Sequence, residues 1–125
     1  MAGPKQTVLL VDDDEGVLRT FCRVLKRKGY FVVAAGSGRE ALDSLERFVF
    51  DAAIMDLHLP DAEGKDLLKM IQETAPNTTR IVLTGSPEAI NTYEDAAKIS
   101  DAFLLKPIEP EAFLMILEEK IRRKG

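Results

Sequence analysis

The sequence predicts an α/β fold: a doubly wound, five-stranded parallel sheet whose two faces are both covered by helices. Five short apolar runs alternate along the chain with five segments whose apolar residues recur at helical spacing. The runs are almost continuously apolar, which is typical of strands buried on both faces. Strands that alternate with helices of this length indicate successive βα units and therefore a parallel sheet.

The expected strands are residues 8–11, 30–34, 52–55, 80–83 and 102–105. The first helix carries apolar residues at positions 17–25, is capped by Asp14, and ends at Gly29, because glycine tolerates the left-handed conformation that follows a helix. Ser37 is the expected N-cap of the second helix. The apolar face of that helix is expected to comprise Ala41, Leu42 and Leu45.

The remaining three helices are marked by their prolines. The third is expected to end before Pro76, and the fourth to begin at Pro87 and reach Lys98. Pro110 opens the fifth, and its basic end at residues 122–124 suits the C-terminus of a helix. The expected apolar residues are Leu67, Leu68, Met70 and Ile71 in the third helix, and Ala112, Phe113, Ile116, Leu117 and Ile121 in the fifth.

The composition fits one globular domain. The chain has 125 residues, of which 46% are hydrophobic and 30% charged. We expect residues 1–6 to be a disordered lead-in and residues 7–123 to form the domain. The net charge of −4 gives no indication of direct binding to nucleic acid or to an anionic membrane.

The single cysteine, Cys22, excludes an internal disulfide and is expected to be a core residue. The N-terminal residues do not resemble a signal peptide, and no apolar run is long enough to cross a membrane. We therefore expect a cytoplasmic protein.

Polar residues follow the ends of four predicted strands. Asp12 and Asp13 follow the first strand, Asp56 the third, Thr84 the fourth and Lys106 the fifth. Carboxyl ends of parallel strands share one edge, where ligands bind in such sheets. Three neighbouring carboxylates repel one another, and Mg²⁺ would offset their charge. A lysine and a hydroxyl suit a phosphate group, and a carboxylate can act as a nucleophile toward phosphorus.

Four segments of the chain resemble the receiver domains of two-component response regulators. They are residues 8–15 (VLLVDDDE), 54–60 (IMDLHLP) followed by Gly64, 83–85 (LTG) and 103–107 (FLLKP). The resemblance covers about residues 7–122. It implies a flavodoxin-like receiver fold with strand order 2-1-3-4-5.

The resemblance implies a role for each residue around the acceptor. Asp56 would be the phosphoacceptor and would also face the metal. Asp12 and Asp13 would form the acidic pair that holds Mg²⁺ or Mn²⁺, with Asp13 as the more direct ligand. The backbone carbonyl of His58 would complete the protein ligands.

The resemblance also implies a switch. Thr84 and Lys106 would contact the phosphoryl group, and Phe103 would turn inward as Thr84 moves. The donor would be a phosphohistidine of a sensor histidine kinase or of a histidine phosphotransfer protein. Phosphorylation would reshape the face made by helix four, strand five and helix five, for an output domain, another partner or a homodimer. The chain would be a signalling domain and not an enzyme acting on a separate substrate.

The chain departs from the family pattern in three places. Glu63 replaces the usual aspartate before Gly64, residues 99–102 lack the usual Gly-Ala pair, and the switch aromatic is phenylalanine and not tyrosine. The resemblance also implies that His58 and Ser86 are candidates for setting how fast the phosphoryl group hydrolyses. Ile90 and Tyr93 are expected either to contact partners or to pack in the interior.

Other interpretations are weaker. The aspartates at 12–14 could serve merely as caps of the first helix. The metal site is favoured for Asp12 and Asp13 because Asp56 and Lys106 share their edge of the sheet. A calcium-binding EF-hand loop fails because Gly16 is followed by Val17. Asp12 and Asp14 resemble the aspartate pair of haloacid-dehalogenase phosphatases. That family has threonine or valine at the position of Gly16, which argues against this interpretation. An unphosphorylated interaction module on the same fold is a third alternative, and a flavin binder lacks its phosphate loop.

Overall fold

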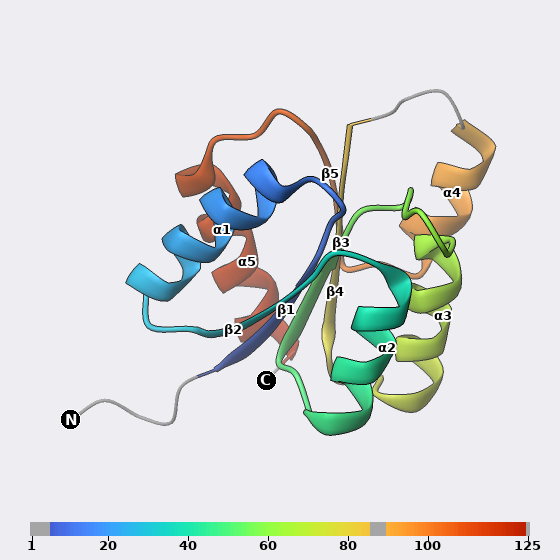
Figure 1. Ribbon diagram of the computed structural model, residues 1–125, viewed down its shortest axis with the longest axis horizontal. Coiled ribbons are helices and arrows are strands. Elements are labelled where there is room, and N and C mark those ends of the chain that lie inside the picture. Colours follow the sequence, from blue (N-terminus) through green and yellow to red (C-terminus); the bar gives the residue numbers. More distant parts are fainter. Residues whose placement is uncertain (1–5, 86–89, 125) are drawn as a thin grey trace.

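The sheet and its helices form in the order that the sequence predicts (Figure 1). The computed structural model describes residues 6–85 and 90–124. The strands are β1 (Thr7–Val11), β2 (Phe31–Ala35), β3 (Ala52–Met55), β4 (Thr79–Thr84) and β5 (Ala102–Leu105). The helices are α1 (Glu15–Arg27), α2 (Gly38–Arg47), α3 (Gly64–Thr74), α4 (Ile90–Lys98) and α5 (Pro110–Lys124).

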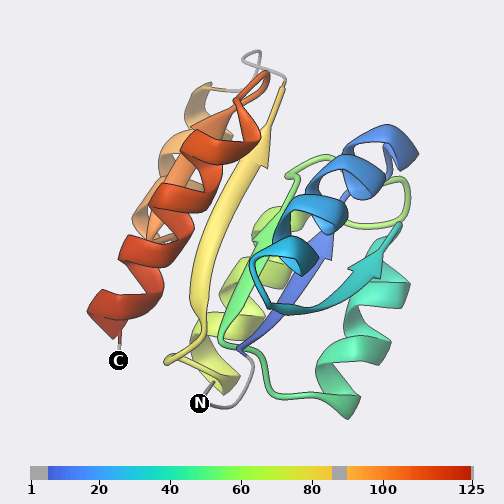
Figure 2. The same ribbon diagram turned by 90° about the vertical axis from the view of Figure 1, so that its left-hand side faces the viewer.

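All strand pairs are parallel, and their order is β2-β1-β3-β4-β5, which confirms the predicted fold class and order. Helices α1 and α5 cover one face of the sheet, and α2, α3 and α4 cover the other (Figures 1 and 2). The strand order reverses between β1 and β3. In sheets of this kind, ligands bind beyond the carboxyl ends of the strands at that reversal.

Each face of the sheet has its own core, because successive residues of a strand point to opposite faces. Val8 and Leu10 of β1 pack under α1 and α5, whereas Leu9 and Val11 pack under α2 and α3. Phe113 of α5 is fully buried in the first of these cores. Its ring meets Phe21 of α1 edge to face, at a centroid distance of 5.0 Å. The contact between these rings joins the two helices on that face.

The helix ends follow the predicted local chemistry. Asp14 caps α1 by accepting hydrogen bonds from the N–H groups of Gly16 and Val17, and Gly29 has φ 95° after the helix ends. Ser37 caps α2 by accepting from the N–H of Glu40 at 3.2 Å. Glu40 in turn accepts from the N–H of Gly36 at 2.6 Å, which ties the first turn of α2 to the residue before its N-cap.

The structure corrects three details of the sequence prediction. Strand β2 begins at Phe31 and not at Tyr30, because the Tyr30 N–H still bonds the Leu25 carbonyl at the end of α1. Leu42 of α2 is 39% exposed, so it does not belong to the core.

In α5, Ala112 is exposed and Leu114 is buried. The buried stripe centres on Phe113 and Leu117 and extends toward Leu114. Each helical residue turns by about 100°, which places Ala112 outside that stripe.

Some predictions fall outside the described part of the chain. These are the lead-in up to residue 5, the helix start at Pro87 and the position of Ser86, together with the side chains of Ile90 and Tyr93. Helix α4 ends at Lys98 as predicted. None of the described helices combines the length and apolar composition that crossing a membrane requires.

Replacement of Phe113 by alanine should lower the free energy of unfolding by about 3–5 kcal/mol, because it removes a fully buried ring and leaves a cavity. Urea unfolding followed by circular dichroism measures the change. Met115→Ala is the matched control in the same helix, since Met115 is 73% exposed and its truncation should change stability little. Equal effects of the two substitutions would contradict the assigned core.

Candidate functional site

The residues that follow β1, β3 and β5 are fixed in place by the neighbouring strands. The N–H of Asp12 bonds the carbonyl of Ala35 at 3.0 Å, and the N–H of Asp56 bonds that of Val11 at 3.0 Å. The N–H of Lys106 bonds the carbonyl of Thr84 at 2.8 Å. The parallel pairing therefore continues one residue past each strand and carries these side chains to one rim of the sheet.

Lys106 lies between two carboxylates at this rim. Its Nζ donates to Asp12 Oδ2 at 2.6 Å and to Asp56 Oδ2 at 3.0 Å. The side chain of Asp12 is 3% exposed and that of Asp56 is 11% exposed, whereas that of Lys106 is 22% exposed. The two ion pairs are thus largely shielded from solvent. Charges in such a shielded position interact more strongly than charges at an open surface.

The other oxygen of Asp56 is also held. The Thr84 hydroxyl donates to Asp56 Oδ1 at 3.0 Å, and the His58 N–H donates to the same oxygen at 3.1 Å. Three donors from three segments therefore fix the Asp56 carboxylate. Two of them, the hydroxyl and the ammonium, are groups that also bind phosphate oxygens.

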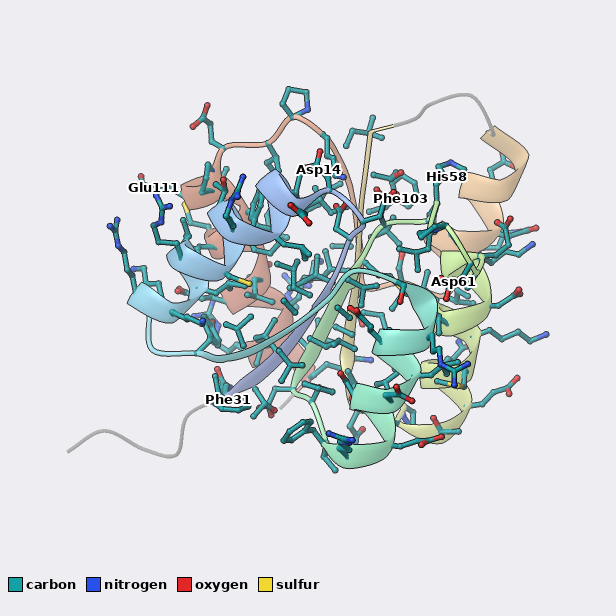
Figure 3. All side chains as sticks on the ribbon, viewed as in Figure 1. Asp14, Phe31, His58, Asp61, Phe103 and Glu111 are labelled. Atoms are coloured by element: carbon teal, nitrogen blue, oxygen red, sulfur yellow. The ribbon has the colours of Figure 1, made fainter. Side chains whose placement is uncertain are left out.

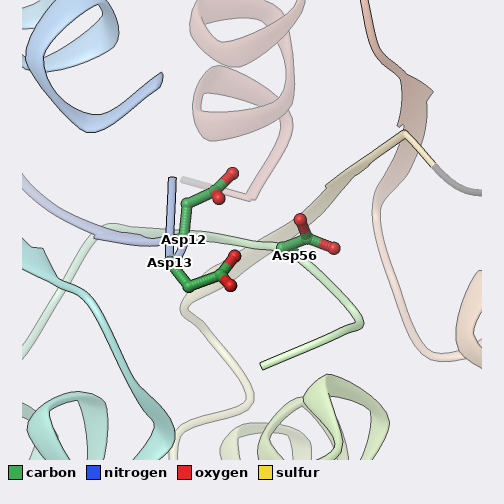
Figure 4. A group of neighbouring side chains, drawn as sticks. All are labelled: Asp12, Asp13 and Asp56. Atoms are coloured by element: carbon green, nitrogen blue, oxygen red, sulfur yellow. The ribbon is translucent and has the colours of Figure 1, made fainter. Parts of the chain in front are cut away.

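Asp13 completes an acidic cluster with Asp12 and Asp56. One carboxylate oxygen from each of the three lies within 4.8 Å of the others. Figure 4 shows Asp12 and Asp13 extending their carboxylates toward the side on which Asp56 lies. Asp12 is buried and Asp13 is exposed, so the cluster reaches from the interior to solvent.

The charges at the site do not balance. Burial raises the pKa of Asp12 above its ordinary value, and the nearby Asp56 adds to the rise, although Lys106 and the Asp14 N–H act in the opposite direction. Burial alone would lower the pKa of Lys106, but its bonds to Asp12 and Asp56 outweigh burial and raise that pKa. Three carboxylates facing one ammonium leave an excess of negative charge. An all-oxygen donor set with this excess fits a hard divalent cation such as Mg²⁺.

The structure brings together the residues that the sequence singles out. Asp12, Asp13, Asp56, Thr84 and Lys106 line one shallow cleft, together with Asp14, His58 and Gly85. The side chain of His58 is exposed at the rim of this cleft (Figure 3).

Phe103 does not line the cleft. It lies on β5 opposite Val82 and packs, partly buried, against the core under α2, α3 and α4.

The loop that leads from Asp56 to α3, residues 57–63, contributes His58 to the lining of the cleft. The Gly64 N–H closes the loop by bonding the Leu57 carbonyl at 2.9 Å. A Cβ atom at Gly64 would overlap the carbonyl oxygen of Asp56, which explains why glycine stands there. Sequence reasoning missed one residue of this loop, Asp61, which bonds the N-terminus of α2. No local pattern marks that contact, because its partners lie 22 and 23 positions earlier in the chain.

Known proteins share this fold and about a third of this sequence. The family model described as "Response regulator receiver domain" matches residues 8–118. The alginate biosynthesis transcriptional regulatory protein AlgB of Pseudomonas aeruginosa is 34% identical over 94% of this chain. The chain spans only 30% of the length of that relative.

Solved structures agree with the family match. A CheY-like response regulator receiver domain protein from Methanospirillum hungatei superposes with a TM-score of 0.92 and 30% identity, over 97% of both chains. A response regulator from Burkholderia pseudomallei, crystallised with a phosphorylated aspartic acid, calcium ion and citrate, has a TM-score of 0.83 and 32% identity, over 95% of this chain and 70% of that one. The chain belongs to the response regulator receiver domain family.

Proposed function

We propose that the chain is a phosphorylation-dependent signalling switch that accepts a phosphoryl group on Asp56 beside a bound Mg²⁺ ion. The observation that carries the proposal is the position of the Asp56 carboxylate. It lies next to Asp13 in the acidic cluster and within hydrogen-bond distance of both Lys106 and Thr84. We take residues 7–123 as the receiver domain.

In this proposal Asp12, Asp13 and Asp56 hold the metal ion, together with the backbone carbonyl of His58. Mn²⁺ would fit the same oxygen donors. When bound, the ion would offset the charge of the carboxylates and of the incoming phosphoryl oxygens. The excess negative charge of the cluster supports this assignment, because Lys106 offsets the charge of only one carboxylate.

The chain's own residues would position the transfer. An oxygen of Asp56 attacks the phosphorus of a phosphohistidine, the P–N bond breaks, and the imidazole leaves with the electron pair and takes up a proton. The ionised Asp56 needs no separate base. Lys106 and Thr84 already donate to the two Asp56 oxygens, and they would donate to phosphoryl oxygens after transfer.

The donor would be a sensor histidine kinase or a histidine phosphotransfer protein. The phosphorylated aspartic acid of the Burkholderia protein supports a phosphoacceptor in a domain of this fold. AlgB is a transcriptional regulatory protein of greater length, which supports an output domain or separate partner downstream of the switch. The net charge of −4 supports action through a protein partner and not through direct contact with nucleic acid.

Thr84 and Phe103 would carry the signal to the face made by α4, β5 and α5. Thr84 bonds Asp56 directly, and it pairs in register with Leu105, two residues after Phe103. Movement of the threonine toward a phosphoryl group would therefore change the conformation of β5. The altered face would bind an output partner or a second copy of the chain.

Incubation with acetyl phosphate and Mg²⁺ should add one phosphoryl group to the wild-type protein, as measured by intact mass spectrometry. Asp56→Asn should abolish this gain, because an amide oxygen is not a competent nucleophile. Asp43→Asn is the matched control, since Asp43 is exposed on α2. Persistent phosphorylation of the Asp56→Asn protein, or its loss in Asp43→Asn, would contradict the assignment.

Beryllofluoride with Mg²⁺, which mimics the phosphoryl group, should shift amide signals near Asp56 and also along β5 in ¹H–¹⁵N NMR spectra. In Thr84→Ala the shifts near Asp56 should persist while those around Phe103 fall to a small fraction. Thr20→Ala, on the exposed side of α1, serves as the control. Unchanged shifts around Phe103 in the Thr84→Ala protein would show that the signal takes another route.

A further inference from the structure

We propose that Asp61 is a positioning residue for the phosphorylation site: it ties the β3–α3 loop to the N-terminus of α2 and so keeps the His58 backbone in place beside Asp56. The inference rests on the proposed function, because it concerns the loop that would supply a metal ligand. It adds a residue that lies outside the acidic cluster and does not line the cleft.

The Asp61 carboxylate makes a bidentate contact with the N-terminus of α2. Its Oδ1 accepts a hydrogen bond from the N–H of Gly38 at 2.7 Å, and its Oδ2 accepts one from the N–H of Arg39 at 3.0 Å. N–H groups in the first turn of a helix have no partner within the helix and carry its partial positive charge. These two hydrogen bonds hold the pKa of Asp61 below its ordinary value, so the carboxylate stays ionised in this contact.

The loop also rests directly on the helix. A Cβ atom at Gly38 would lie 2.5 Å from the Cβ of Ala62, so any other residue at position 38 would push the loop away. The residue next to Asp61 is therefore in close contact with the same helix start. Figure 3 shows Asp61 near the end of the sheet at which His58 also lies.

The loop that Asp61 holds is in direct contact with the acceptor Asp56. The His58 N–H donates to Asp56 Oδ1 at 3.1 Å, and His58 forms a bridge with Glu63 across the loop. The Gly64 N–H closes the base of the loop on Leu57. Asp61 lies between the bridged residues and fastens the tip of the loop to the first turn of α2. Without it, the base would remain closed while the backbone near His58 became less fixed.

A purely structural role as a helix cap explains the contact less well. Helix α2 already has a local cap, because Ser37 accepts from the Glu40 N–H, and Glu40 also accepts from the N–H of Gly36 just before the helix. These local contacts remain when Asp61 is replaced. What Asp61 adds is a link between two elements, one of which contacts the acceptor.

The test compares Asp61→Ala, Asp61→Asn and Ser37→Ala with the wild-type protein in the absence of a phosphodonor. Mg²⁺ is titrated and its dissociation constant is read from amide shifts in ¹H–¹⁵N NMR spectra, which also verify that each variant is folded. Asp61→Ala should weaken Mg²⁺ binding by about tenfold, as is typical when support of a ligand is removed. Hydrogen exchange of the His58 amide should become faster in the same variant.

The other two variants separate positioning from helix stability. Asp61→Asn should restore part of the affinity, because its amide oxygen can still accept one of the two hydrogen bonds. Ser37→Ala removes a cap from the same helix without touching the loop, and it should leave the Mg²⁺ dissociation constant unchanged within error.

Wild-type affinity in Asp61→Ala, or an equal loss in Ser37→Ala and Asp61→Ala, would overturn the inference while the proposed function stands. Absence of Mg²⁺ binding by the wild-type protein would instead contradict the proposed function itself.

Discussion

The ammonium group of Lys106, held between the buried carboxylates of Asp12 and Asp56, is the interaction on which the site depends. It joins the ends of β5, β1 and β3, because Lys106 lies 94 residues from Asp12 and 50 residues from Asp56 in the sequence. Buried charges are costly unless they are paired, and here one cation serves two anions. With Asp13 beside them, the carboxylates still outnumber the ammonium group. The same arrangement that stabilises the rim of the sheet therefore leaves it electrostatically suited to a divalent cation and a phosphoryl group.

The parallel register of the strands is what makes this arrangement possible. Backbone hydrogen bonds continue past the strand ends to Asp12, Asp56 and Lys106, so their side chains leave the sheet at one level. The β3–α3 loop then closes over Asp56 through Gly64, where a side chain would overlap the acceptor's own carbonyl. The fold therefore determines the site. The apolar strands set the distances between the site residues, and the polar residues at the strand ends supply the functional groups.

Much of this was predictable because the signals are local. A buried strand that ends at a carboxylate, a hydroxyl or a lysine is visible in the sequence, and parallel geometry places such ends together. The strand order came only from the family resemblance. Leu42 and Ala112 follow the helical spacing of apolar residues and are nevertheless exposed. Spacing predicts an apolar stripe but not which residue lies at its centre, because the centre depends on how the helix packs on the sheet. Asp61 was missed because its partners, Gly38 and Arg39, become neighbours only in the folded chain.

Anomalous diffraction from crystals soaked in Mn²⁺ would test the central claim most directly, because Mn²⁺ shares the oxygen-ligand preference of Mg²⁺ and can be located by its own scattering. We expect one strong peak between the carboxylates of Asp13 and Asp56, on the side of the His58 carbonyl. The Lys106 ammonium should remain beside Asp12. A crystal in which Mn²⁺ binds elsewhere on the protein and leaves this cluster without a peak would contradict the account.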